Sequence, residues 1–189
     1  FLIGNLSLIA DLFGSFNDAI ILIVHNNFSV PNMIFISYLN LNDIYTELIL
    51  EQSRNKKNRR EIDNPTYKEL GHNPSCGDEI TLYVLMDGDI LKDVSYTGVG
   101  CAISQASTSI MVDTIKGLEK NETIKLANDF IEMIKGKELT EKEMDELGDA
   151  IAFESIKNLP ARVKCAVLPW YTIKNILEEG KTQGSFTVE

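Results

Sequence analysis

The sequence predicts an α+β protein, because a β-hairpin pattern is followed by a series of helical patterns. Apolar side chains alternate along residues 79–98, which is typical of two paired strands with one buried face. From residue 102 onward the apolar spacing becomes helical, and helix caps accompany it. With 189 residues, the chain is long enough for one domain with its own core.

The first helical pattern covers residues 41–53, where the apolar side chains lie near one face. Five basic side chains follow within residues 54–60, either as a solvated helix end or as a docking patch for an acidic partner. In the hairpin at 79–98, Asp87-Gly88 is the expected turn, because this dipeptide suits a two-residue loop.

Caps and apolar spacing predict a succession of helices after the hairpin. Pro169 would lie inside the last helix, where it is expected to remove the bond to the Cys165 carbonyl and to kink the helix. Residues 180–189 are expected to be a frayed tail. Three helices are predicted with both ends: Ala102 to a C-cap at Gly117, about Thr123 to Lys135, and Ala150 to Asn158. For two others only the start is predicted: one begins at the capping box of Thr140 and Glu143, and the last begins at Pro160.

The N-terminal 40 residues differ from the rest and predict a separate segment. They are apolar but interrupted by polar residues, and no basic side chain precedes Arg54. Translation starting at Met33 would make residues 1–32 an extension, whereas an apolar helix over about 11–24 would pack on the domain or on a second subunit. The expected organisation is an apolar extension at 1–40, a domain at 41–179 and a tail at 180–189.

Charge and cysteine usage restrict the class of protein. The formal net charge of −10 argues against a large nucleic-acid surface. No apolar run approaches the roughly 20 residues of a membrane span. Three cysteines are an odd number for a disulfide framework and fit a reducing compartment. We therefore expect a cytoplasmic protein without nucleic-acid or membrane partners.

Each cysteine stands in its own local motif. Cys76 lies in Asn-Pro-Ser-Cys-Gly-Asp, Cys101 in Gly-Val-Gly-Cys-Ala-Ile-Ser, and Cys165 in Ala-Arg-Val-Lys-Cys-Ala. Three thiolates and the Asp78 carboxylate supply the four ligands of a tetrahedral metal site. Because Cys76 and Cys101 flank the predicted hairpin, its antiparallel return brings them near one another. These groups suit zinc, iron with sulfide, or sulfur carried on a thiolate, and the alternative is three buried, inert cysteines.

These motifs, in this order, resemble the SufU branch of the IscU/NifU N-terminal family over roughly residues 41–178. Lys164 stands where IscU scaffolds typically have His, and the long interval between Cys101 and Cys165 is similar to that of SufU. The resemblance implies an α+β fold with a small antiparallel sheet packed against several helices. It also implies a role in iron–sulfur cluster assembly.

The same resemblance implies a role for each residue of the site. Cys76, Asp78, Cys101 and Cys165 would be zinc ligands, and Arg162 a supporting residue. Cys76 would also accept persulfide sulfur from a SufS-like cysteine desulfurase, which makes the chain a zinc-dependent sulfurtransferase. The sulfur would pass to apo iron–sulfur proteins or to a downstream scaffold.

Two other functions remain open. In the first, the chain is an IscU-type scaffold that binds iron and carries a transient [2Fe–2S] cluster. In the second, it is a structural zinc module that mediates protein contacts, although an Asp ligand is unusual in such sites. Three thiolates and one carboxylate around Zn²⁺ leave a formal charge of about −2, which Arg162 would compensate from one helical turn before Cys165. His72 is a further candidate ligand or proton shuttle.

The chain also departs from the family pattern. Gln52, Lys56 and Arg60 stand where members often have His, Pro and Gly after the first helix. This difference affects the expected loop geometry and partner docking, but it touches none of the four expected ligands.

Overall fold

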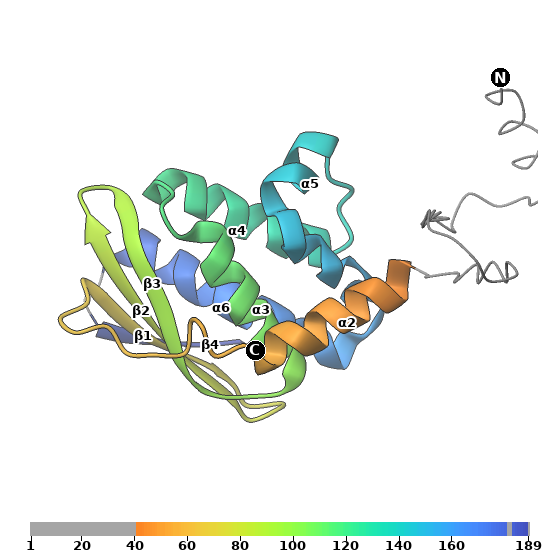
Figure 1. The fold of residues 1–189 in the computed structure, drawn as a ribbon, viewed down its shortest axis with the longest axis horizontal. Helices are drawn as coiled ribbons and strands as arrows, with labels where there is room; N and C mark the ends of the chain where they lie inside the picture. The colour runs from red at the N-terminus through yellow and green to blue at the C-terminus, as the bar shows by residue number, and fades with distance from the viewer. Residues whose placement is uncertain (1–40, 181–182, 189) are drawn as a thin grey trace, which may run out of the picture. The chain divides into compact units, whose positions relative to one another are not determined.

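The residues of the expected hairpin form two strands of a four-stranded sheet, and helices cover one face of that sheet (Figure 1). This computed structural model describes residues 41–180 and 183–188. The extension at 1–40, including Met33, the helix expected at 11–24 and His25, lies outside the described residues. The described elements are α2 (Leu41–Arg54), β1 (Tyr67–Asn73), β2 (Asp78–Asp87), β3 (Ile90–Val99), α3 (Ala102–Ile115), α4 (Lys120–Ile134), α5 (Glu141–Leu147), the 3₁₀ helix η1 (Gly148–Asn158), α6 (Pro160–Glu179) and β4 (Gln183–Thr187).

The α+β fold class is confirmed, with one correction to the sheet. The strand order is β3-β2-β1-β4, in which β1, β2 and β3 are antiparallel but β4 runs parallel to β1. The sheet is therefore mixed rather than antiparallel. The expectation of a frayed tail is wrong for residues 183–187, because these residues pair with the free edge of β1.

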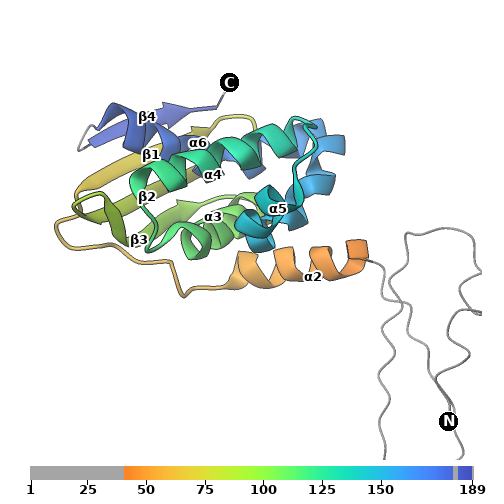
Figure 2. The same cartoon turned by 90° about the horizontal axis from the view of Figure 1, so that it is seen from above.

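Strand β1 was not predicted, and its sequence explains why. Its buried positions are Glu69, Gly71 and Asn73, so no large apolar side chain marks the buried face. Gly71 faces α6, where a Cβ atom would collide with the side chain of Thr172. The missing side chain allows the helix to lie close to the strand (Figure 2).

The hairpin turn lies one residue further along than predicted. Asp87 pairs with Ile90, so the two central residues are Gly88 and Asp89. Gly88 has a φ of 60°, which a glycine adopts without steric cost. The predicted alternation is confirmed for the first part of β2, where Ile80 and Leu82 are fully buried, but further along Tyr83 is buried as well as Val84.

The helical predictions are largely confirmed. Cys101 is the N-cap of α3, the Thr140–Glu143 capping box begins α5, and Pro160 is the first residue of α6. Helix α6 continues through Pro169. The segment expected as a helix over 150–158 is a 3₁₀ helix that already begins at Gly148.

The core lies between the sheet and helices α3 and α6, and it continues between α6 and α4. Trp170 of α6 is fully buried and stacks on Phe130 of α4, with ring centroids 4.3 Å apart. Its indole Nε1 donates to the Ser107 hydroxyl of α3 at 3.0 Å. One aromatic side chain thus joins the three helices and sets the position of α6 over the sheet.

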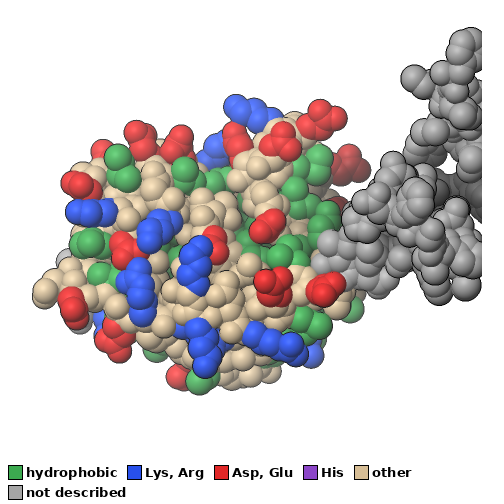
Figure 3. Space-filling view, viewed as in Figure 1, with side chains coloured by type: hydrophobic (Ala, Val, Ile, Leu, Met, Phe, Trp, Pro, Cys, Tyr) green, Lys and Arg blue, Asp and Glu red, His purple; other side chains and the backbone are tan. Residues whose placement is uncertain are grey.

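Most of the basic side chains in residues 54–60 contact other residues of the protein. Lys57 pairs with Asp113 at 2.9 Å, Arg60 pairs with Asp93 at 2.7 Å, and Arg59 donates to Gln105. On the face shown in Figure 3, basic and acidic side chains lie among one another. These contacts favour a solvated segment tied to the fold over a docking patch. Among the described residues, no helix is both long and apolar enough to span a membrane.

Candidate metal centre

The loop between β1 and β2 carries the first cysteine motif. Asn73 and Asp78 face each other as the last paired residues of the two strands, and residues 74–77 form the turn. Gly77 has a φ of 69°, which allows the chain to return within this short loop. The hairpin therefore holds Asp78 buried at its base and leaves Cys76 exposed near its tip.

The connection from β3 to α3 places Cys101 beside Asp78. The Cys101 backbone N–H donates to Asp78 Oδ1 at 2.8 Å, and the Cys101 Sγ accepts from the Ser104 backbone N–H at 3.5 Å. A Cβ atom on Gly100 would come within 3.0 Å of Asp78 Oδ1, closer than such contacts normally are. The glycine thus permits the close approach of the carboxylate to the start of α3.

Helix α6 supplies the third cysteine. Cys165 is fully buried, and its Sγ lies 3.2 Å from the Sγ of Cys76. This separation is well beyond the roughly 2.05 Å of a disulfide, and all three cysteines are free thiols. The Ala161 carbonyl of the first turn lies 3.9 Å from the Cys165 Sγ and 4.0 Å from the Cys76 Sγ.

The structure brings three of the four expected ligands together. One ligand atom each of Cys76, Asp78 and Cys165 lies within 4.8 Å of the others, which is close enough to hold a metal ion. The Cys101 Sγ lies outside this group and caps α3 instead. Cys101 is nevertheless tethered to the cluster through its backbone bond to Asp78.

The electrostatics of the cluster oppose an isolated thiolate at Cys165. Burial raises the pKa of the Cys165 thiol well above its usual range. Hydrogen bonds with Cys76 and Asp78 and the negative charges of Cys101 and Asp78 raise this pKa further. A bound cation would reverse the balance, because a metal ion deprotonates a coordinating thiol.

Asn73 is a residue of the site that sequence reasoning missed. Its side chain is fully buried, and its Nδ2 lies 3.0 Å from Asp78 Oδ2 and 3.4 Å from the Cys165 Sγ. The available signal was its place in the Asn-Pro-Ser-Cys-Gly-Asp motif, in which sequence reasoning gave ligand roles only to Cys76 and Asp78. Because Asn73 is neutral, it contributes hydrogen bonds to the cluster without a charge.

The other sequence candidates lie around the cluster rather than in it. Arg162 is exposed in the first turn of α6, and within residues 41–180 and 183–188 its side chain forms no ion pair. Lys164 is half-buried on the same helix. His72 pairs with Glu79 across β1 and β2 and is not a member of the three-ligand group.

The donor set fits a zinc ion or an iron-containing cluster. Thiolate and carboxylate donors are ordinary zinc ligands, and thiolates also ligate iron–sulfur clusters. The buried Ser104 hydroxyl has no hydrogen-bond partner in the described structure. The Ser104 hydroxyl and Asp78 Oδ1 both lie beside Gly100. A buried hydroxyl without a partner next to the expected ligand Asp78 fits a site that a bound metal ion or cluster completes.

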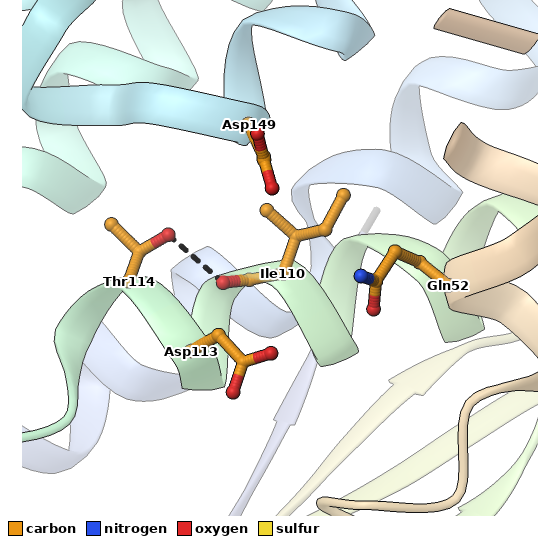
Figure 4. Close-up of a pocket in the computed structure, with 5 residues that line it drawn as sticks. All are labelled: Gln52, Ile110, Asp113, Thr114 and Asp149. Carbon is orange, nitrogen blue, oxygen red and sulfur yellow. Dashed lines mark hydrogen bonds between the residues drawn. The ribbon is translucent and has the colours of Figure 1, made fainter.

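A separate hollow does not involve the cysteines. Gln52, Ile110, Asp113, Thr114 and Asp149 line it, from α2, α3 and η1 (Figure 4). The Thr114 hydroxyl donates to the Ile110 carbonyl, and Asp113 is paired with Lys57. Gln52, Asp113 and Thr114 thus have partners within the protein, and the cysteine cluster is the stronger candidate for function.

Comparison with known proteins identifies the family. The family described as "NifU-like N terminal domain" matches residues 44–166, which include Cys76, Asp78, Cys101 and Cys165. The chain belongs to this family. The resemblance to the IscU, SufU and NifU proteins is therefore confirmed.

Relatives in the NifU-like family carry two kinds of name. The iron–sulfur cluster assembly scaffold protein IscU of Thermotoga maritima is 40% identical over 72% of this chain and 94% of its own length. The zinc-dependent sulfurtransferase SufU of Bacillus subtilis is 35% identical over 71% of this chain and 90% of its own length. Both names concern iron–sulfur cluster assembly or sulfur transfer, and neither relative is much closer than the other.

A solved structure supports the same fold. The crystal structure of a putative iron–sulfur cluster assembly scaffold protein for the SUF system from Fervidobacterium islandicum matches with a TM-score of 0.67. It is 44% identical, and the match covers 73% of this chain and 99% of that one. The sheet and helices described above are thus the fold of this family.

Proposed function

We propose that the protein acts in iron–sulfur cluster assembly, as a sulfur acceptor that takes persulfide sulfur on Cys76. The observation that carries the proposal is the contrast within the cluster. Cys76 is exposed, whereas its neighbours Cys165 and Asp78 are buried. A sulfur acceptor needs one thiol that a partner protein can reach, held beside groups that control its ionisation.

Cys76, Asp78, Cys101 and Cys165 would hold a zinc ion in the proposed site. Cys101 is included because its backbone N–H donates to Asp78 and it begins α3 beside the cluster. Bound zinc would keep the thiols deprotonated at neutral pH without taking part in redox chemistry. The exposed Cys76 and the carboxylate ligand argue against a purely structural zinc module.

The transfer step is a displacement at sulfur. The Cys76 thiolate attacks the terminal sulfur of a cysteine persulfide on the desulfurase. A new S–S bond forms at Cys76 while the S–S bond of the donor breaks, and the donor cysteine leaves as a thiolate. The step needs no external oxidant or reductant, because the sulfur arrives at the persulfide oxidation level.

The second candidate is a scaffold that receives iron and sulfide and carries a [2Fe–2S] cluster to apo-proteins as its cargo. The Thermotoga maritima relative named IscU favours it. The same four residues serve this function, since a carboxylate is a harder and more easily exchanged ligand than a fourth thiolate. The two candidates differ in whether sulfur arrives on Cys76 before any iron is present.

The deciding experiment uses the purified full chain loaded with zinc and free of iron. It is mixed in a small amount with a SufS-type cysteine desulfurase and L-cysteine, and the modified peptides are mapped by mass. We expect faster desulfurase turnover and one additional sulfur atom on Cys76. A chain that gains no sulfur without iron, but forms a transferable cluster when iron is supplied, would contradict the acceptor function and favour the scaffold.

Arg162→Ala is expected to slow sulfur acceptance roughly three- to tenfold at low ionic strength, with little change in stability. The exposed Arg162 guanidinium lies in the same turn as Ala161, whose carbonyl contacts both site thiols. Its positive charge would attract the anionic persulfide and offset the negative charge of the site. Transfer rates at several salt concentrations and urea unfolding midpoints test this prediction.

Lys174→Ala is the control, because it removes a cation from the same helix in a later turn than Cys165, where the lysine pairs with Glu178. This control should transfer sulfur at the wild-type rate. Equal rates for Arg162→Ala and the wild type at every salt concentration would refute the role of Arg162.

A further inference from the structure

We propose that Asn73 is a positioning residue that determines which ligand of the site can leave. In this proposal Asn73 restrains Asp78 and Cys165 and leaves Cys76 free to move toward a partner. The inference rests on the zinc site proposed above and deepens it. It assigns a role to a residue that is neither a metal ligand nor an acid or base.

The hydrogen bonds of the Asn73 amide identify its orientation. The Asn73 Oδ1 accepts from the Ser75 backbone N–H at 3.2 Å, so the oxygen end of the amide faces a donor. The nitrogen end therefore faces the cluster, where its two hydrogens have two acceptors, Asp78 Oδ2 at 3.0 Å and the Cys165 Sγ at 3.4 Å. Both donors of the buried amide are thus used at the site, and its oxygen accepts one hydrogen bond.

Asp78 is restrained from two sides. Asn73 donates to its Oδ2, and the Cys101 backbone N–H donates to its Oδ1 at 2.8 Å. Both donors are neutral. Asn73 is paired with Asp78 in the sheet, and Cys101 is the N-cap of α3, shortly after the end of β3. Hydrogen bonds to an ionised acceptor are stronger than those between neutral groups, so the carboxylate is held in one orientation.

Cys165 is restrained in a similar way. It is buried in α6, and the Asn73 amide bridges it to Asp78 although Asn73 and Cys165 are 92 residues apart in the sequence. A hydrogen bond to a thiolate stabilises the anion and lowers its tendency to leave or to react. The amide thus favours Cys165 as a permanent ligand.

Cys76 lacks such a restraint. It lies in the exposed turn, where its backbone N–H donates to the Asn73 carbonyl at 3.3 Å. The described contacts of its side chain are with the Cys165 Sγ at 3.2 Å and, at the long distance of 4.0 Å, with the Ala161 carbonyl. Asn73 donates no hydrogen bond to it. Of the three clustered ligands, two are therefore fixed and one can turn outward, which is the arrangement that an acceptor thiol requires.

The test measures the order in which the cysteines react. The zinc-loaded full chain is treated briefly with limiting iodoacetamide, and the alkylated cysteines are identified by peptide mass mapping. In the wild type we expect Cys76 to react first and Cys165 to be protected. In Asn73→Ala the preference for Cys76 over Cys165 should fall about tenfold, which is the scale of a hydrogen bond to a charged group. Zinc release to a coloured chelator should accelerate in parallel.

Two further variants separate positioning from stability. Asn73→Leu keeps the branched shape without the donors and should behave like Asn73→Ala. Asn175→Ala removes another amide–carboxylate bond, from Asn175 to Glu69 at 2.7 Å, and should retain the wild-type reaction order.

An unchanged order in both Asn73 variants would overturn the inference, and so would an equal change in Asn175→Ala. Failure of both Asn73 variants to fold would also overturn it, because a positioning role requires the site to assemble without Asn73. Neither readout involves a desulfurase. A protein that binds zinc and shows the expected order but accepts no sulfur would therefore contradict the proposed function alone.

Discussion

Cys76→Ser is expected to abolish sulfur acceptance while the fold remains intact. The serine hydroxyl is not ionised at neutral pH, so the variant lacks the thiolate that attacks the persulfide. Because Cys76 is exposed in a turn, the substitution should change the free energy of unfolding by less than about 1 kcal/mol. Desulfurase turnover and the mass of the protein after incubation with L-cysteine measure the loss.

Ser75→Ala is the matched control, since it alters the neighbouring exposed residue of the same turn without removing a thiol. This variant should stimulate the desulfurase as the wild type does. If Cys76→Ser still gained sulfur, on Cys101 or on Cys165, the assignment of the acceptor thiol would be wrong.

Gly98→Ala is expected to lower the free energy of unfolding by about 3 kcal/mol or more. Gly98 lies near the end of β3 with a φ of 137°, a conformation that residues with a side chain rarely adopt. A Cβ atom at this position would also collide with the backbone carbonyl of Glu79, which the paired strand holds in place. Since Gly98 shortly precedes Cys101, the variant should weaken zinc binding as well.

Gly88→Ala separates the cost of backbone strain from the cost of the collision with the Glu79 carbonyl. Gly88 also has a positive φ, at the opposite end of the same hairpin, but a Cβ atom there would have no neighbour within 4 Å. We expect this control to lose only about 1 kcal/mol, from backbone strain alone. Urea unfolding of the two variants gives the comparison, and equal losses would show that the collision with Glu79 contributes nothing.

The sequence predicted those elements whose signals are local. Alternating apolar residues marked β2 and β3, and the Thr140–Glu143 capping box marked the start of α5. Strand β1 escaped prediction because its buried residues are Glu69, Gly71 and Asn73, which only the packing of α6 and β4 makes suitable for a strand. Strand β4 escaped because a short segment becomes a strand only where a sheet edge is available to it.

In the candidate site, too, some residues could be predicted from local motifs and others could not. The motifs around the cysteines named Cys76, Asp78, Cys101 and Cys165, because thiolates and a carboxylate are recognisable as metal donors wherever they lie. The role of Asn73 could not be predicted from the sequence. A side-chain amide is neither an acid nor a base, and its effect depends on the groups to which it is hydrogen-bonded. Its contact with the Cys165 Sγ joins residues from opposite ends of the domain.

The family, the hairpin and the set of donor groups could be predicted from the sequence, since each depends on residue type and short-range spacing. Which donors meet, which thiol faces solvent and which thiol is restrained could be seen only in the folded protein. Burial and hydrogen-bond partners arise there because three segments pack together: the β1–β2 loop, the start of α3 and the first turns of α6. The exposure of Cys76 and the burial of Cys165 therefore cannot be predicted from any one of these segments alone.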